Sequence, residues 1–285
     1  MDIKKVGVVG CGLMGRGIVE VAARAGYTVI VSEINQELLD KGMAALDASL
    51  AKAVKAGKAT EEDKAATMKR ITGTTKTDDF KVCDRVIEAA IENMELKKKI
   101  FVDLDKICPP QVILATNTSC LSVLDIAAVT KRRDKVLGIH FFNPVPLMKL
   151  VELVKTIDTS EETLKAAKAF AESVGKEVVT ASDTPGFIVN RLLMPFLLEA
   201  MKLLESGAAT REDIDKAVKL GLNHPLGPFA LLDVVGLDTA SFICNAMYDE
   251  FKEPRFAPPI LLKKLVTAGH YGRKSGKGFY DYKQA

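Results

Sequence analysis

The stretch KKVGVVGCGLMGRGIVEVAARAGYTVIVSE, from Lys4 to Glu33, decides the fold of this chain. Its first part, Lys4–Gly10, is an apolar run that predicts a buried strand, and a helical pattern follows to about Ala25. A second strand of mostly β-branched residues is predicted over Tyr27–Glu33. A strand, a glycine-rich turn, a helix and a second strand in this order are typical of one unit of a parallel α/β sheet.

Three glycines in the turn, Gly10, Gly12 and Gly15, have the spacing G-x-G-x-x-G. Glycines at these positions permit a tight turn and let the backbone approach a pyrophosphate at the helix N-terminus. The bare motif also occurs in incidental turns, but here it follows a predicted strand and opens a helix. The sequence therefore predicts a dinucleotide site formed by Gly10, Gly12, Leu13, Met14, Gly15 and Glu33.

The cofactor is predicted from Glu33, which ends the second strand. A carboxylate there can accept hydrogen bonds from a ribose diol and repels a 2′-phosphate. Its neighbours Ser32, Ile34 and Asn35 supply no arginine that would bind such a phosphate. We therefore expect NAD rather than NADP. FAD uses the same glycine fingerprint, but residues further along the chain favour NAD.

Strand and helix signals continue to alternate as far as about residue 183. Further strands are predicted near residues 71–74, 85–90, 112–117, 136–141, 149–155 and 177–180. A polar helical excursion, turned once near Ala56-Gly57, covers residues 36–70. This alternation predicts a Rossmann-type, mostly parallel sheet covered by helices, in an NAD-binding domain of residues 1–183.

The remaining residues, 184–285, are expected to form a second, all-α domain that contributes to a substrate cleft and to dimerisation. Its first helix is predicted from SDTPGFIVNRLL, with Asp183 or Thr184 as N-cap and Pro185 at the first helical position. A second helix is predicted from ATREDIDKAVKLG, which has a Thr-x-x-Asp start at Thr210 and a glycine stop at Gly221.

The composition excludes several classes of protein. The 285 residues carry a net charge of +3 and are 48% hydrophobic and 27% charged, which is ordinary for a globular protein and argues against a nucleic-acid partner. No segment approaches the roughly 20 apolar residues that cross a membrane, and the N-terminus lacks the features of a secretory signal. Five scattered cysteines without CxxC pairs argue against zinc and disulfides. We therefore expect a cytoplasmic protein without a bound metal.

Candidate catalytic residues lie at the ends of two predicted strands. LATNTSC presents Asn117 and Ser119, and GIHFFNP presents His140 and Asn143. Open α/β sheets bind ligands at the carboxyl ends of their strands, so we expect these residues near the nicotinamide. The alternative for His140 is a core histidine whose ring nitrogens are satisfied by neighbours.

A third segment, MKLVELV, places Glu152 in an otherwise apolar strand. A buried carboxylate needs a partner, because an unpaired buried charge is very costly. If this strand runs antiparallel beside residues 136–141, Glu152 can reach the imidazole of His140, fix its tautomer and stabilise the imidazolium. A salt bridge to Lys149 or another lysine is the alternative.

These segments together resemble the L-3-hydroxyacyl-CoA dehydrogenase family in its single-function bacterial form. The matching pieces run in the expected order from residue 6 to 282 and include VGVVGCGLMGRGI, VIEAAIENMELKK, ATNTSCLS, GIHFFNPVPLMKLVELV, DTPGFIVNRLL and HPLGPFALLDVVGLD. HFFNP and DTPGFIVNR are far more specific than the glycine fingerprint. Two departures are modest: Glu33 stands where aspartate is common, and Cys120 stands where a second serine is usual.

The resemblance implies reversible NAD-dependent oxidation of a (3S)-3-hydroxyacyl-CoA to a 3-oxoacyl-CoA. A four-carbon substrate, 3-hydroxybutyryl-CoA, is expected, in fatty acid or butyrate metabolism. His140 would be the general acid/base, oriented by Glu152, while Ser119 and Asn190 would hold the substrate oxygens. Asn190 would enter the cleft from the C-terminal domain. An exposed helix asparagine is the alternative for that residue.

Two further groups gain a role only from the resemblance. Glu92 and Lys97, in IENMELK, match positions near the nicotinamide and its ribose, whereas alone they would indicate a solvated helix start. Ser49, Lys52 and Lys55 lie at i, i+3 and i+6 of a predicted helix, which alone indicates a solvated face. Beside an acyl-CoA they become candidate ligands of its phosphates. The competing interpretations are a dehydrogenase of free hydroxy acids and a non-catalytic descendant of such an enzyme.

Overall fold

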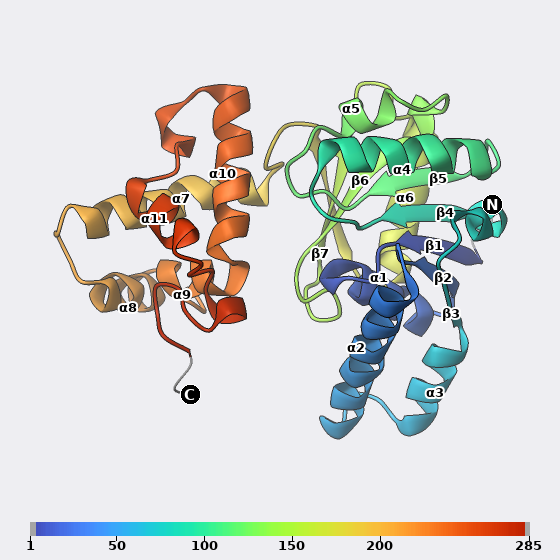
Figure 1. Cartoon of the computed structure of the whole chain (residues 1–285), viewed down its shortest axis with the longest axis horizontal. Coiled ribbons are helices and arrows are strands. Elements are labelled where there is room, and N and C mark those ends of the chain that lie inside the picture. Colours follow the sequence, from blue (N-terminus) through green and yellow to red (C-terminus); the bar gives the residue numbers. More distant parts are fainter. Residues whose placement is uncertain (1–3, 283–285) are drawn as a thin grey trace. The chain divides into compact units, whose positions relative to one another are not determined.

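The computed structural model describes residues 4–282, which fall into two compact units (Figure 1). The first unit ends at Thr184 and the second begins at Pro185.

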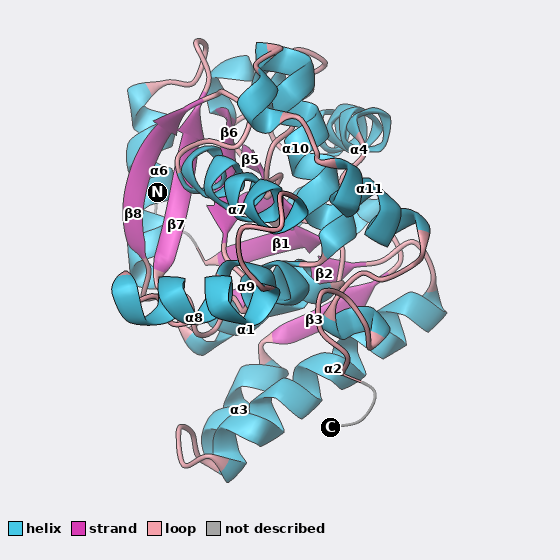
Figure 2. Ribbon diagram, turned by 90° about the vertical axis from the view of Figure 1, so that its left-hand side faces the viewer, coloured by secondary structure: helices cyan, strands magenta, loops and turns pink. Residues whose placement is uncertain are grey.

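The first unit is built on one eight-stranded sheet with the order β3-β2-β1-β4-β5-β6-β7-β8 (Figure 2). The strands are β1 Lys5–Val9, β2 Thr28–Ser32, β3 Ile71–Thr74, β4 Arg85–Glu88, β5 Ile113–Thr116, β6 Val136–Phe141, β7 Leu150–Lys155 and β8 Glu177–Ser182. The first six run parallel, β7 is antiparallel to β6, and β8 is parallel to β7. The predicted strands and the mostly parallel sheet are confirmed.

Helices connect and cover these strands. They are α1 Leu13–Arg24, α2 Gln36–Lys55, α3 Glu61–Lys69, α4 Met94–Ile107, α5 Val123–Ala127 and α6 Glu161–Ser173. The predicted helical excursion is α2 and α3, and the chain turns between them at Gly57, whose φ is +68°. The largest cluster of buried apolar side chains joins α1 and α6 to the sheet. Burying these side chains supplies the main driving force for forming the unit.

Short polar side chains fix where the helices of the sheet unit begin. Asn35 accepts a hydrogen bond from the backbone of α2, and Asn93 does the same for α4. Thr60 forms a reciprocal capping box with Asp63 at the start of α3. Each cap satisfies a backbone N–H that has no partner inside its helix, which stabilises the helix by about 1 kcal/mol.

The second unit is helical, as predicted. Its helices are α7 Val189–Glu205, α8 Arg211–Gly221, α9 Pro228–Val235, α10 Leu237–Phe251 and α11 Ile260–Thr267. Thr210 caps α8 by accepting from the amide of Asp213, so the predicted start of that helix is confirmed. Over residues 4–282 no single helix is long and apolar enough to cross a bilayer, and α9 with α10 meets that test only as a pair bent by 94°.

The C-terminal segment of the second unit is held by a buried aspartate. Asp233, on α9, accepts hydrogen bonds from the backbone amides of Phe279 and Tyr280 and from the hydroxyl of Tyr282. A Cβ on Gly278 would lie 2.0 Å from its Oδ1, so the approach requires glycine. The segment GRKSGKGFYDY therefore has a structural role in this unit.

The predicted start of the first helix of this unit is wrong. Helix α7 begins at Val189 rather than at Pro185, and the residues between them form a turn. In that turn Gly186 and Phe187 have positive φ values of 78° and 46°. A left-handed backbone cannot continue a helix, so the helical segment starts only after these two residues.

Asp183, a predicted cap for α7, caps a different helix. Its two carboxylate oxygens accept hydrogen bonds from the amides of Val123 and Leu124, at the start of α5. The preference of aspartate for helix N-termini was therefore a correct signal, but the helix is distant in the sequence.

Candidate active site

The glycine-rich turn joins β1 to α1, and its geometry fits a dinucleotide. Gly10 has a φ of +97°, and a Cβ there would lie 2.8 Å from the carbonyl oxygen of Ala89. A Cβ on Gly15 would lie 1.9 Å from the carbonyl oxygen of Gly10. Apart from its neighbours in the chain, none of residues 4–282 has an atom within 4 Å of the Cβ position of Gly12, the N-cap of α1. The outer glycines thus close the turn, while the middle one leaves its surface open to a pyrophosphate.

Glu33 lies one residue beyond β2 and reaches the glycine-rich turn. Its Oε1 accepts from the backbone N–H of Cys11 at 2.7 Å, and its Oε2 accepts from the N–H of Ile34 at 3.2 Å. The carboxylate is therefore held beside the turn, where a ribose would be recognised. Burial, with the charge of Glu33 next, raises the pKa of the Cys11 thiol to about 11, so this thiol is neutral at physiological pH.

His140 and Glu152 face each other across two antiparallel strands. They are paired in the register of β6 and β7, and His140 Nδ1 lies 2.7 Å from Glu152 Oε2. His140 is 5% exposed and Glu152 is fully buried. An ionised carboxylate can only accept, so with Glu152 ionised Nδ1 carries the proton and Glu152 fixes the tautomer of the ring. The predicted antiparallel pairing and the contact between the two side chains are confirmed.

The carboxyl ends of neighbouring strands lie together at one edge of the sheet. The backbone N–H of Asn117 donates to the carbonyl oxygen of Glu88 at 2.7 Å. The side-chain oxygen of Asn117 accepts from the backbone N–H of Phe141 at 2.9 Å. Asn117 thus ties the ends of β4, β5 and β6 together. Since β1 is parallel to β4 and beside it, the glycine-rich turn lies at this same edge. Ser119 follows β5 and is half-buried, and Asn143 follows β6 and is exposed.

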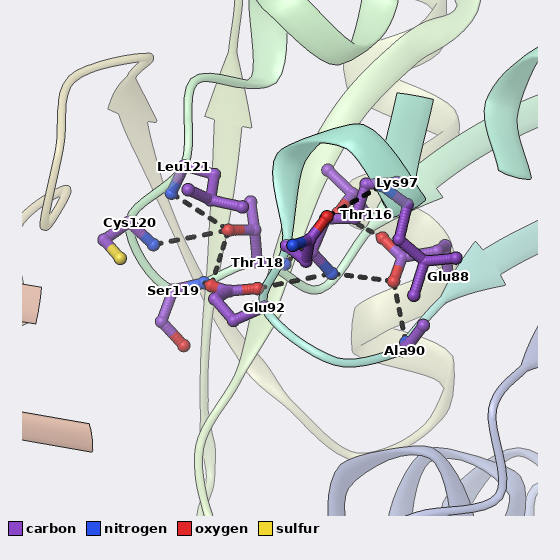
Figure 3. Close-up of polar contacts among 11 residues, drawn as sticks. Glu88, Ala90, Glu92, Lys97, Thr116, Thr118, Ser119, Cys120 and Leu121 are labelled. Atoms are coloured by element: carbon purple, nitrogen blue, oxygen red, sulfur yellow. Dashed lines mark hydrogen bonds and ion pairs between the residues drawn. The ribbon is translucent and has the colours of Figure 1, made fainter. Parts of the chain in front are cut away.

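A buried ionic network lies beside Ser119 (Figure 3). Lys97, on α4, is 1% exposed, and its Nζ lies 2.7 Å from Glu88 Oε1 and 3.2 Å from Glu92 Oε2. The other oxygen of Glu92 accepts from the amide of Ser119 at 2.6 Å and from the Thr118 hydroxyl at 2.7 Å. The alternative of a solvated helix start for Lys97 is therefore wrong. Its Nζ is engaged by two carboxylates. Contact of Lys97 and of the more exposed Glu92 with the cofactor stays a prediction.

Glu88 was missed in the sequence, although it is fully buried. The signal was available, because Glu88 is a carboxylate in the apolar run RVIEAA, just as Glu152 is in MKLVELV. A charge in a predicted buried strand requires a partner, and that partner is Lys97.

The residues predicted to contact CoA lie near the end of α2. Lys52 and Lys55 are exposed. Ser49 differs, because its hydroxyl donates to Glu20 Oε2 on α1 at 2.8 Å, and Glu20 is buried. The structure therefore leaves the two lysines at the surface, while Ser49 connects α2 to α1.

Asn190 belongs to the second unit. It is the second residue of α7 and is half-buried, so it is not the exposed asparagine considered as an alternative. Its contact with substrate stays a prediction.

Two family models together match nearly the whole chain. Residues 5–184 match the NAD binding domain of 3-hydroxyacyl-CoA dehydrogenase, and residues 186–282 match the C-terminal domain of the same family.

Characterised proteins match the chain over its full length. A 3-hydroxybutyryl-CoA dehydrogenase of Mycobacterium tuberculosis is 49% identical, with 98% of this chain and 99% of that protein covered. The mitochondrial hydroxyacyl-coenzyme A dehydrogenase of Sus scrofa is 46% identical, with 99% and 92% covered. The crystal structure of (S)-3-hydroxybutyryl-CoA dehydrogenase PaaH1 from Ralstonia eutropha superimposes with a TM-score of 0.94 at 46% identity, covering 99% of each chain.

Proposed function

The chain belongs to the 3-hydroxyacyl-CoA dehydrogenase family, and from this premise we propose how its own residues carry out the reaction. The reaction is the reversible NAD-dependent oxidation of a (3S)-3-hydroxyacyl-CoA to the 3-oxoacyl-CoA. In our proposal His140 is the general acid/base and Glu152 orients it. The 2.7 Å contact between the two buried side chains is the observation that carries this assignment.

His140 moves the proton of the reaction. Nδ1 is the nitrogen that Glu152 binds, so the exchange with substrate falls to Nε2. During oxidation Nε2 takes the proton of the 3-hydroxyl group, and the imidazolium that forms is stabilised by the buried carboxylate. In the reverse direction the same nitrogen returns the proton to the 3-oxo oxygen. Glu152 acts through His140 and does not itself exchange a proton with the substrate.

The cofactor is held by the glycine-rich turn and the acidic residue beside it. Gly12 and the start of α1 would receive the pyrophosphate, and Glu33 would accept from the ribose hydroxyls. When bound, NAD accepts the hydride that leaves C3 of the hydroxyacyl group. Asn117, Asn143 and Glu92, at the ends of the strands, would surround the nicotinamide end.

Two polar side chains would hold the substrate oxygens. Ser119, from the first unit, and Asn190, from the second, are proposed to donate hydrogen bonds that strengthen as charge develops on the reacting oxygen. Such donors act most strongly where water is excluded.

The substrate class follows from the family, and its chain length is inferred. Relatives named for 3-hydroxybutyryl-CoA support a four-carbon acyl group. The exposed Lys52 and Lys55 on α2 would interact with phosphates of the CoA nucleotide. Replacing the two lysines should weaken the binding of an acyl-CoA but not that of a free hydroxy acid, which carries no such phosphates.

We further infer a homodimer in the cytoplasm. Large apolar side chains of the second unit, Leu192, Leu220 and Leu222, are exposed, which suits an interface between two copies. All five cysteines are buried thiols, which suits a reducing compartment.

Turnover with defined substrates tests the proposed function. NADH oxidation is followed with acetoacetyl-CoA and, separately, with free acetoacetate, and each reaction is repeated with NADPH. We expect turnover with NADH and acetoacetyl-CoA, and much weaker turnover when either the CoA group or the cofactor is changed. Equal rates with free acetoacetate would assign the chain to free hydroxy acids instead. An absence of turnover with all four combinations would contradict the enzymatic assignment.

A further inference from the structure

We propose that Glu88 is a positioning residue for the reaction: through Lys97 and Glu92 it fixes the backbone at Ser119 and so orients the Ser119 hydroxyl. The inference rests on the proposed function, because it gives the Ser119 hydroxyl a role in holding substrate oxygens. Glu88 lies at the end of β4, Lys97 on α4 and Ser119 beyond β5, so the proposal links three elements through one chain of contacts (Figure 3).

Glu88 is fixed by three donors. Its Oε1 accepts from the amide of Ala90 at 2.7 Å and from Lys97 Nζ at 2.7 Å, and its Oε2 accepts from the Thr116 hydroxyl at 2.7 Å. The carboxylate is fully buried, so these bonds are not weakened by competing water. Glu88 is therefore a rigid acceptor at the base of the network.

Lys97 connects Glu88 to Glu92. Its ammonium is almost fully buried between Glu88 and Glu92, and it must remain paired because an uncompensated buried charge is strongly destabilising. Glu88 holds the ammonium at the shorter distance, 2.7 Å against 3.2 Å for Glu92. If Glu88 loses its charge, Glu92 becomes the only anionic partner of Lys97 in the network. We expect the ammonium and the Glu92 carboxylate then to shift toward each other.

Glu92 holds the segment that carries Ser119. One oxygen, Oε1, accepts both from the Ser119 amide and from the Thr118 hydroxyl. The Thr118 hydroxyl oxygen also accepts from the amide of Leu121 at 3.0 Å. A displaced Glu92 therefore shifts the backbone at Ser119. Errors in placing a reacting group of about 1 Å can reduce rates about a hundredfold, so a smaller shift is expected to have a measurable effect.

The test is a double-mutant cycle between Glu88 and Ser119. Glu88→Gln keeps the shape of the side chain and removes its charge. With Ser119 present, we expect Glu88→Gln to lower kcat for acetoacetyl-CoA reduction about tenfold. With Ser119→Ala as the background and NADH saturating, the same change should have almost no further effect on kcat, because the hydroxyl that it displaces is gone. Any weakened contact between the displaced Glu92 and the cofactor would instead raise the KM for NADH, and equally in both backgrounds. An equal loss in both backgrounds would show a general structural role and would overturn the proposal, as would a Glu88→Gln enzyme as active as wild type.

A matched control separates positioning from loss of stability. Asp105 forms another ion pair on α4, with the buried Arg132, whose Nε lies 2.7 Å from Asp105 Oδ1. Asp105→Asn makes the same chemical change in the same unit, so both variants should lower the melting temperature, but only Glu88→Gln should lower kcat. An equal loss of kcat in Asp105→Asn contradicts the proposal.

A milder variant keeps the test possible if Glu88→Gln does not fold. Glu88→Asp keeps the charge but shortens the side chain by one methylene, which withdraws the carboxylate from Lys97 Nζ, and the same cycle with Ser119→Ala is then run. A smaller loss that again disappears in the Ser119→Ala background is expected. A loss that persists there overturns the proposal. Because wild-type turnover is measured first, failure of the proposed function appears as an inactive wild type and is not confused with failure of this inference.

Discussion

At the scale of single residues, Glu33 is the residue that we propose selects the cofactor. Its carboxylate is held beside the glycine-rich turn by the amide of Cys11, so a negative charge lies where the adenosine ribose would bind. The carboxylate would accept hydrogen bonds from the two ribose hydroxyls of NAD and would repel the 2′-phosphate of NADP. Replacing Glu33 by a neutral residue should remove both the hydrogen bonds from the ribose hydroxyls and the repulsion of the 2′-phosphate.

Glu33→Ser tests this assignment. We expect the ratio of kcat/KM for NADPH to that for NADH to rise at least about tenfold, which corresponds to about 1.4 kcal/mol of lost discrimination. The ratio is the measurement of choice, because the variant also leaves the Cys11 amide without its acceptor and should slow both reactions. Glu37→Ser, which removes an exposed carboxylate on α2, is the matched control. An unchanged ratio, or an equal change in the control, contradicts the assignment.

Single residues also show how far the sequence could predict the site. The pair of His140 and Glu152 was predicted because both lie in apolar strands that a short loop makes antiparallel neighbours. The same argument applies to Glu88, but its partner Lys97 lies on a helix, and the sequence pattern there does not show that the face carrying Lys97 is buried. Which oxygen bonds to which donor depends on packing between distant segments, and no spacing in the sequence encodes that.

At the scale of elements, helix α2 combines a structural face with an exposed one. Ser49 donates to buried Glu20 on α1, while Lys52 and Lys55 remain exposed near the end of α2. Fixing one face against α1 gives the exposed lysines a defined position on the first unit. An anionic nucleotide is the ligand class that this charge suits.

Charge reversal on α2 tests its role. Lys52→Glu combined with Lys55→Glu should raise KM for acetoacetyl-CoA about tenfold or more, because two attractive charges become repulsive. The KM for NADH should not change, nor should the KM for an acetoacetyl thioester of pantetheine, which has no nucleotide phosphates. Lys41→Glu with Lys69→Glu makes the same change in net charge at exposed positions of α2 and α3 and is the control. A KM for acetoacetyl-CoA equal to that of the control contradicts the assignment.

Elements were predicted well where pattern alone determines them. Most strands of the sheet follow from a short apolar run between turn residues, with β3 (ITGT) as an exception, and most helix starts follow from a capping side chain. The start of α7 was not predictable in this way, because Pro185 and Asp183 suit a helix N-terminus while the positive φ of Phe187 excludes one. Asp183 instead caps α5, about sixty residues earlier in the chain. The tertiary structure brings these two segments together, and local sequence does not show it.

At the scale of the whole molecule, a parallel sheet gathers distant segments at one edge. The glycine-rich turn, Ser119 and His140 follow or end strands that lie side by side in the order β1-β4-β5-β6. The reversed direction of β7 then brings Glu152 back to His140. Topology thus explains why residues separated by more than a hundred positions lie at the same end of the sheet. The second unit has its own helical core, and its contribution through Asn190 and through dimerisation stays a prediction.

The most direct test of the account is the activity of a His140→Gln variant. A glutamine amide can still donate to Glu152, so the buried carboxylate keeps a partner, but it cannot exchange a proton with the substrate. With saturating NADH and acetoacetyl-CoA, we predict that kcat falls about a thousandfold, within the range of general acid/base catalysis, while NADH binding measured by fluorescence is unchanged. A kcat close to that of wild type would show that His140 is not the acid/base and would contradict the central claim.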